Sequence, residues 1–205
     1  MRIKNIRITH PETAKIVASK LLRIERLSTE LFEECETFQL EEHERIEFKM
    51  QIGKLILSCN EFIMNIVKVN KVSKAGVDQE SIQIAVEHWK NFLGSERAES
   101  PMILINADAE KTIIYSRLDF AELVLVRMEQ VQKEIDETIN FIDEADCSED
   151  EKLGLRAMLG YFVGFYNTIH LPIFADHPAL IPQDSNWREM VDDFKRELLE
   201  SNMDS

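Results

Sequence analysis

The chain has 205 residues, of which 24 are Lys or Arg and 38 are Asp or Glu, so its formal net charge is −14. This acidic balance argues against general affinity for nucleic acid or for anionic membranes, because both require a basic face. With only 6 Gly and 5 Pro, the chain is too poor in turn residues for a many-stranded β fold or a glycine-rich phosphate loop. The composition predicts a helical protein with one sizeable core.

Charge is unevenly distributed along the chain. Residues 1–30 hold seven basic and three acidic side chains, whereas residues 101–150 hold thirteen acidic and four basic ones. The basic start either packs near the acidic middle, within one chain or across a dimer, or leaves an acidic surface that meets a basic partner. The candidate partner-binding acids are Glu129, Glu134, Asp136, Glu137, Asp143 and Glu144.

The first helix is predicted to begin at Thr9, which has capping-box spacing to Glu12 and is followed by Pro11 in the first turn. Its apolar stripe consists of Val17, Leu21, Ile24, Leu27 and Leu31. A second helix is predicted from about residue 40 to about residue 70. Its second half is apolar nearly all round, as is typical of the helix at the centre of a bundle. A third helix is predicted to end at Gly94, a natural C-terminal cap.

Residues 102–115 leave two predictions open, a small β-hairpin or a helix that begins at Asp108. From Leu118 onward, apolar residues recur in steps of three and four, which predicts a heptad seam packed inside a bundle or across a dimer. The seam consists of Leu118, Ala121, Leu125, Met128, Gln132, Ile135, Ile139 and Ile142.

Ser148 and Glu151 have capping-box spacing and predict the start of a further helix. That helix is predicted to stop before Pro172, because residues 171–182 hold three of the five prolines and are not expected to form regular helix. A last helix is predicted to be capped by Asp184 or Ser185. The fold predicted for residues 1–205 is therefore mostly α, a single-domain bundle of five or six helices.

Cys35, Cys59 and Cys147 are widely spaced and include no C-x-x-C pair. This pattern does not predict a disulfide framework and favours a reducing compartment. The N-terminus leads into a charged helix rather than an apolar region, so no secretory signal is expected. The most apolar stretch, residues 55–69, is interrupted by polar side chains and is too short to span a bilayer. A cytoplasmic location without membrane contact is expected.

An aromatic segment surrounds Gly160 and Gly164, whose spacing predicts a tight helix crossing. The aromatic side chains are expected either to belong to the core or to form an outward apolar groove for a partner or a small ligand. The groove candidates are Tyr161, Phe162, Phe165, Tyr166 and Phe174.

Two sets of residues are candidate metal ligands. His170, Asp176 and His177 are the right types for zinc or iron, although residues 176–178 are also typical of a turn. Glu30, Glu33 and Glu36 have the E-x-x-E spacing with which all-α nucleotide pyrophosphohydrolases bind Mg²⁺ between helices. The E-x-x-D partner of that pattern is missing after Glu61, because Met64 and Asn65, three and four residues further on, are not acidic. Glu189 and Asp192 have this spacing, but far along the chain.

The sequence contains no nucleotide-binding loop, nucleophile elbow or H-E-x-x-H motif. We therefore predict a non-catalytic acidic protein that binds and regulates another macromolecule, as an inhibitor, immunity or adaptor protein. It is expected to need no cofactor, to form a homodimer, to bind a protein partner of basic character and not to bind nucleic acid directly. The alternatives are a Mg²⁺-dependent all-α nucleotide pyrophosphohydrolase and a small-ligand-binding helical sensor.

Overall fold

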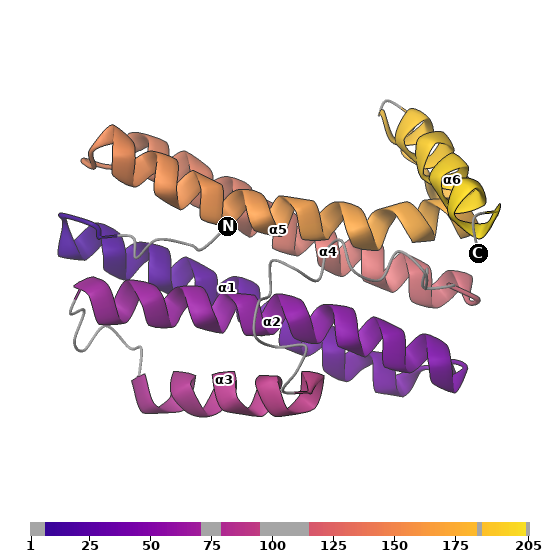
Figure 1. Cartoon of the computed structure of the whole chain (residues 1–205), viewed down its shortest axis with the longest axis horizontal. Coiled ribbons are helices and arrows are strands. Elements are labelled where there is room, and N and C mark those ends of the chain that lie inside the picture. Colours follow the sequence, from indigo (N-terminus) through magenta and orange to yellow (C-terminus); the bar gives the residue numbers. More distant parts are fainter. Residues whose placement is uncertain (1–6, 71–78, 95–114, 184–185, 204–205) are drawn as a thin grey trace.

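The computed structural model of the chain describes residues 7–70, 79–94, 115–183 and 186–203. These residues form six α-helices and two short 3-10 helices and contain no strand (Figure 1). The elements are α1 (Pro11–Glu34), η1 (Cys35–Thr37), α2 (Glu42–Asn70), α3 (Gln79–Leu93), α4 (Leu118–Glu144), α5 (Glu149–Asp176), η2 (Pro178–Leu180) and α6 (Trp187–Met203). The predicted mostly helical bundle is confirmed.

The four longest helices run alongside one another, and neighbours point in opposite directions. In Figure 1, α1 lies beside α2 and α4 beside α5, and α1 also packs against α4. Helix α3 packs on the outer side of α2, while α6 stands at an angle to the bundle where α5 ends. Antiparallel neighbours joined by short turns are the common arrangement of helical bundles.

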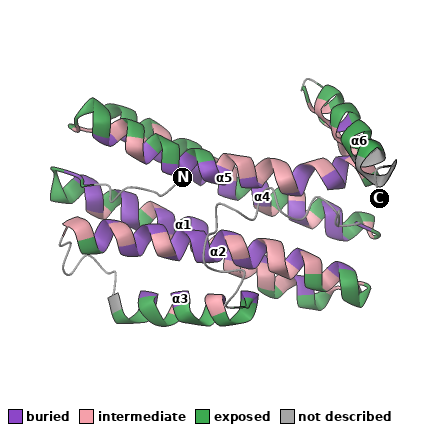
Figure 2. Cartoon of the chain, viewed as in Figure 1, coloured by how far each residue is buried: buried purple, intermediate pink, exposed green. Residues whose placement is uncertain are grey.

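The apolar side chains of these helices form one core cluster, and α2 is buried on most of its sides (Figure 2). Along α4, the predicted seam is half correct. Its buried column consists of Ala121, Val124, Met128, Val131, Ile135, Thr138 and Ile142. Leu125, Gln132 and Ile139, which the prediction placed in the seam, are half-buried, and Leu118 is exposed. The buried column differs from the predicted seam because α4 packs against two helices, α1 and α5, rather than against one.

The two predicted capping boxes have different outcomes. Ser148 accepts a hydrogen bond from the Glu151 backbone, and the Glu151 side chain accepts one from the Ser148 backbone, which confirms the box at the start of α5. The box predicted at Thr9 is wrong. His10 occupies the N-cap position of α1 without a side-chain cap bond, because Thr9 donates instead to Glu151.

Helix α5 continues through Pro172 to Asp176, so the prediction that it stops before the proline is wrong. Proline lacks the N–H that would bond to the carbonyl four residues earlier, which ordinarily destabilises a helix interior. Here Pro172 is buried and is followed by Ile173 and Phe174, both of which lie in the core. Burial of these apolar side chains offsets the lost backbone bond.

Helix α3 approaches α2 closely at Gly53. A Cβ atom added there would lie 3.4 Å from the Trp89 ring of α3, whereas one added at Gly160 or Gly164 would meet nothing within 4 Å. The tight crossing predicted at the latter pair is therefore wrong. Gly94 follows α3 with a φ of 85°, which confirms it as the C-terminal cap.

All three cysteines are free thiols, as the absence of a disulfide framework in the sequence predicted. Cys35 and Cys59 are fully buried and Cys147 is half-buried. No helix in the described part of the chain combines the length and the apolarity that a membrane span requires. Of residues 102–115, for which a hairpin or a helix is predicted, residues 102–114 lie outside the described residues. Residues 184–185, where a helix cap is predicted, also lie outside them.

Candidate functional site

Two of the candidate partner-binding acids on α4 form ion pairs with basic side chains of α1. The Glu134 carboxylate lies 2.8 Å from the Arg23 guanidinium, and its side chain is only 10 % exposed. Glu137 lies 3.7 Å from the Lys20 ammonium. Lys20 and Arg23 belong to the basic start of the chain, so these two ion pairs confirm that this start packs near the acidic middle within one chain.

Both ends of α4 carry further internal ion pairs. Asp143, another candidate partner-binding acid, lies 2.6 Å from the Arg156 guanidinium of α5. Near the other end, Arg127 donates two hydrogen bonds to the Glu34 carboxylate at the end of α1. These hydrogen bonds raise the pKa of Arg127, so the guanidinium stays charged. Ion pairs therefore connect α4 to both of its neighbours.

Three acids of α4 are spaced seven residues apart and lie along the outward side of the helix. Glu122, Glu129 and Asp136 are exposed, and no basic side chain among the described residues pairs with them. We call these three residues the outer acidic row. Glu144 is also exposed and follows the row at the end of α4. Sequence reasoning missed Glu122, although its seven-residue spacing from Glu129 was a readable signal.

The negative charge of the row acts on neighbouring groups. Burial raises the pKa of Tyr166 on α5, and the carboxylates of Glu129 and Asp136 raise it further. The row is not purely acidic, since Lys133 is also exposed on α4 between these two residues. The outward side of α4 therefore carries a net negative charge that extends toward α5.

The aromatic candidates lie inside the bundle. Tyr161, Phe162, Phe165 and Phe174 are buried and Tyr166 is half-buried. Phe62 of α2 meets the rings of Tyr161 and Phe162 edge-on, with centroid separations of 6.1 and 5.4 Å. These rings fill the space between α2 and α5 and belong to the core, so the alternative of an outward apolar groove is wrong.

Of the three glutamates predicted to bind Mg²⁺, two are engaged in ion pairs. Glu30 lies 3.6 Å from Arg26, and Glu36 accepts a hydrogen bond from Lys49, while Glu33 is exposed. Among the residues described, no three His, Cys, Asp or Glu side chains gather in a way that could hold a metal ion.

The other metal candidates, His170, Asp176 and His177, lie in two different environments. His170 lies in an aromatic cluster and is 2 % exposed. Asp176 accepts a hydrogen bond from the Tyr115 N–H at 2.8 Å, and His177 Nε2 lies 2.7 Å from the Tyr115 carbonyl oxygen. Nε2 must therefore carry the proton of His177, because a carbonyl only accepts. Asp176 and His177 hold the backbone of Tyr115 just before α4.

Glu44 of α2 contributes to the same anchor. Its carboxylate accepts hydrogen bonds from the Ser116 N–H at 3.1 Å and from the Ser116 hydroxyl at 2.6 Å, and the residue is 2 % exposed. Sequence reasoning did not single out Glu44, since its partner is 72 residues away and leaves no local pattern. At this end of the bundle, a buried carboxylate of α2 therefore binds the residues just before α4.

A second buried carboxylate, Glu151, lies at the opposite end. One of its oxygens accepts from the N–H and hydroxyl of Thr9, and the other accepts from the N–H and hydroxyl of Ser148. Burial alone would raise the pKa of Glu151, but these hydrogen bonds to the charged form lower it to about 2.

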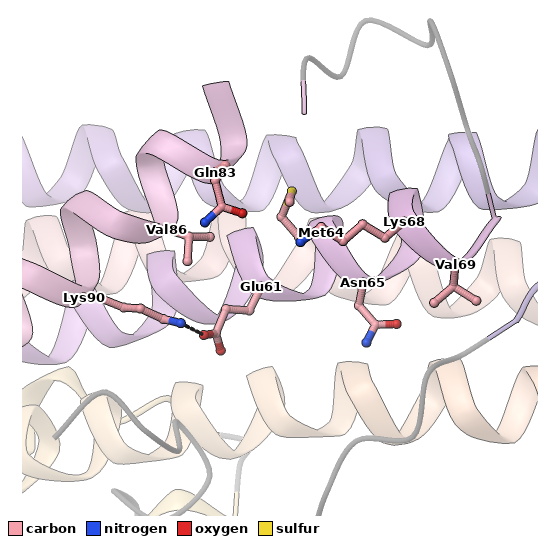
Figure 3. Close-up of a pocket in the computed structure, with 8 residues that line it drawn as sticks. All are labelled: Glu61, Met64, Asn65, Lys68, Val69, Gln83, Val86 and Lys90. Carbon is pink, nitrogen blue, oxygen red and sulfur yellow. Dashed lines mark ion pairs between the residues drawn. The ribbon is translucent and has the colours of Figure 1, made fainter. Parts of the chain in front are cut away.

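A pocket of about 500 Å³ opens between α2 and α3 (Figure 3). The Lys90 ammonium of α3 lies 3.2 Å from the Glu61 carboxylate of α2, so an ion pair connects the two helices at the pocket. The volume is in the range of small-molecule sites, although few polar groups converge in it. Its lining residues are Glu61, Met64, Asn65, Lys68, Val69, Gln83, Val86 and Lys90.

No protein-family model, curated protein or solved structure matches this chain. Two features of the described residues are available to a ligand or partner. The outer acidic row is exposed and lacks basic partners, and the pocket between α2 and α3 is open to the surface.

Proposed function

We propose that this chain is a non-catalytic protein that binds and regulates a basic protein partner through the outward side of α4. The observation that supports this proposal is the contrast between Glu134, which pairs with Arg23 inside the chain, and the outer acidic row, which has no such partner among the described residues. Free thiols fit the cytoplasmic location that forms part of the proposal.

Electrostatics supports this use of the row. Residues seven apart on a helix are separated by about 10 Å, which is close to the screening length at physiological salt. The carboxylates of Glu122, Glu129 and Asp136 therefore produce one continuous negative potential along α4. A partner segment with Lys or Arg at matching intervals would be attracted and oriented by it.

The test is a charge-reversal experiment with a matched control. The double variant Glu129→Lys/Asp136→Lys changes two acids of the row, and the double variant Asp192→Lys/Glu197→Lys makes the same change in net charge at exposed positions of α6. Binding of a fluorescein-labelled nonalysine peptide is measured by anisotropy at 50 mM and 300 mM NaCl. We expect the row variant to lower affinity by about tenfold or more and the control by much less.

Two results would contradict the proposal. Equal losses in both double variants would show that the peptide responds only to total charge. Affinity that does not fall with added salt would exclude attraction by the exposed row. Circular dichroism of each variant establishes that a loss of binding does not reflect unfolding.

The pocket favours a second candidate function, the sensing of a small organic anion. Lys68 is exposed at the pocket and forms no ion pair among the described residues, while Met64 and Val86 supply buried apolar surface. Thermal shift with glutamate, citrate or adenosine monophosphate tests this candidate. We expect stabilisation that is lost in Lys68→Ala; no shift with any of the three anions, or an equal shift in the variant, would reject it.

The predicted homodimer remains part of the proposal. The column shared by the predicted seam and the structure, Ala121, Met128, Ile135 and Ile142, is buried within the chain and so is not available to a second copy. A dimer would have to use other residues. Light scattering distinguishes a mass of 23.9 kDa from twice that value.

A further inference from the structure

Helix α6 is held to the bundle by an aromatic cluster at the end of α5. The Trp187 ring lies 5.5 Å from the His170 ring at an interplanar angle of 20°, and 5.0 Å from the Phe174 ring. The Tyr166 ring also stacks on His170 at 3.7 Å, and its centroid lies 6.1 Å from that of Trp187. Figure 1 shows α6 standing apart from the other helices beyond this contact.

Little else of α6 is buried. Of its described side chains, Val191 is 2 % exposed and Trp187 is half-buried, and most of the others face solvent (Figure 2). The apolar area that holds α6 in place is therefore concentrated in its first turns. Because Trp187 contacts His170 directly, a change at His170 acts on this attachment of α6.

The His170 ring is buried as a neutral group. Its Nδ1 lies 2.8 Å from the Tyr166 carbonyl oxygen, to which it donates, and the residue is 2 % exposed. Burial lowers the pKa of His170 from 6.5 to about 4, although the carbonyl acts in the opposite direction. A charged ring in this cluster would lose its hydration without gaining a carboxylate partner.

The neighbouring elements supply few charges to the ring. On α5 it meets Tyr166 and Phe174, and on α6 it meets Trp187, none of them charged. On α4, Glu129 and Asp136 act on the Tyr166 hydroxyl. On α6, Arg188 and Glu189 follow Trp187 in sequence but are exposed. Attraction of a cationic ring to the faces of Tyr166 and Trp187 opposes the loss of hydration but only in part.

We propose that protonation of His170 releases α6 from the end of α5, so that α6 is a pH-dependent arm of this protein. In the released form, the imidazolium of His170 is hydrated and the Trp187 ring leaves the cluster. The docked form holds fewer protons than the released form between pH 6.5 and pH 4. Docking is therefore strongest above pH 6.5 and weakens as the pH falls, by about 80-fold between pH 6.5 and pH 4.

The experiment uses Trp187 as the reporter. The chain has two tryptophans, so Trp89→Phe leaves Trp187 as the single emitter, and its emission maximum and acrylamide quenching are followed from pH 7.5 to 4. We expect a red shift and stronger quenching with a midpoint between pH 4 and pH 6.5, while the far-ultraviolet circular dichroism stays helical. His170→Phe, which keeps an aromatic ring but cannot be protonated, should abolish the transition, and His43→Gln, at an exposed histidine, should retain it.

If Trp89→Phe impairs folding, the indole N–H resonance of Trp187 in the ¹⁵N-labelled unaltered chain gives the same measurement. An unchanged transition in His170→Phe would overturn the proposal. So would a Trp187 signal that stays constant down to pH 4 or changes only together with loss of helix.

Discussion

On the side of α4 that faces α1, Glu134 is almost fully buried and pairs with Arg23 at 2.8 Å. On the outward side of the same helix, the acids of the outer acidic row are exposed and lack basic partners among the described residues. Both sides of the helix carry acidic side chains. Their difference shows that an acid-rich helix does not define an acidic surface until its neighbours are placed.

The comparison extends to Glu44 and Glu151, which close the two ends of the bundle. Each is buried, and each accepts hydrogen bonds from the backbone and hydroxyl of a residue distant in sequence. Carboxylates of this kind contribute to the fold, whereas those of the outer acidic row are free to contribute to binding. The two groups are expected to respond differently to substitution.

The largest effect on stability is expected at Glu151. Replacing it in Glu151→Ala leaves Thr9 without its acceptor and removes half of the capping box of α5. We expect the free energy of unfolding to fall by about 2–3 kcal/mol, measured by urea denaturation at pH 7. Glu149→Ala, at a neighbouring acid that is 84 % exposed, is the control. A loss of similar size in the control would show that the effect reflects only the helix dipole.

Acid should remove the contribution of Glu151 in a defined range. Its carboxyl has a pKa of about 2 in the folded chain, against an ordinary value of 4.5, so the folded state binds fewer protons between these values. Stability from this group is therefore complete above pH 4.5 and is lost as the pH falls toward 2. The difference in unfolding free energy between the unaltered chain and Glu151→Gln should shrink over this interval. A constant difference would contradict the assignment.

A smaller loss is expected on the inner side of α4. Glu134→Gln removes the ion pair with Arg23, and because the arginine is 59 % exposed the loss should be about 1 kcal/mol. Glu137→Gln, which removes the longer ion pair with Lys20 at 3.7 Å, should lower stability by less than about 0.5 kcal/mol. A double-mutant cycle with Arg23→Gln measures the coupling. No coupling between Arg23 and Glu134 would show that the pair does not hold α1 to α4.

The smallest effect on stability is expected for the outer acidic row. The double variant Glu129→Gln/Asp136→Asn removes two negative charges from exposed positions, so the free energy of unfolding should change by no more than about 0.5 kcal/mol. The same urea titration measures it. A loss above about 1 kcal/mol would show that these acids support the fold, and the comparison between the two sides of α4 would fail.

Local signals in the sequence were sufficient for much of the fold. The apolar run within α2, the Ser148 capping box and Gly94 predicted elements that the structure confirms. Each depends on residues within a few positions of one another. Pro172 misled the prediction because its local effect is outweighed by tertiary burial, which a single segment does not reveal.

The candidate site was less predictable for the same reason. Thr9 and Glu151 are 142 residues apart, and Tyr115 and Asp176 are 61 apart, so neither hydrogen bond leaves a spacing pattern. Composition identified the acidic middle of the chain but not which acids face α1. That division depends on the rotation of α4 about its axis, which is set by packing against α1 and α5 together.

The reactivity of the three free cysteines can report local separation of the helices. Burial raises the pKa of the thiols of Cys35 and Cys59, and alkylating reagents attack the thiolate, so both should react only when the surrounding helices separate. Cys59 lies within α2, whereas half-buried Cys147 lies in the turn between α4 and α5. Mass spectrometry of the alkylated, unaltered protein would therefore give the rate at which each cysteine reacts, and so the order in which the surrounding helices separate.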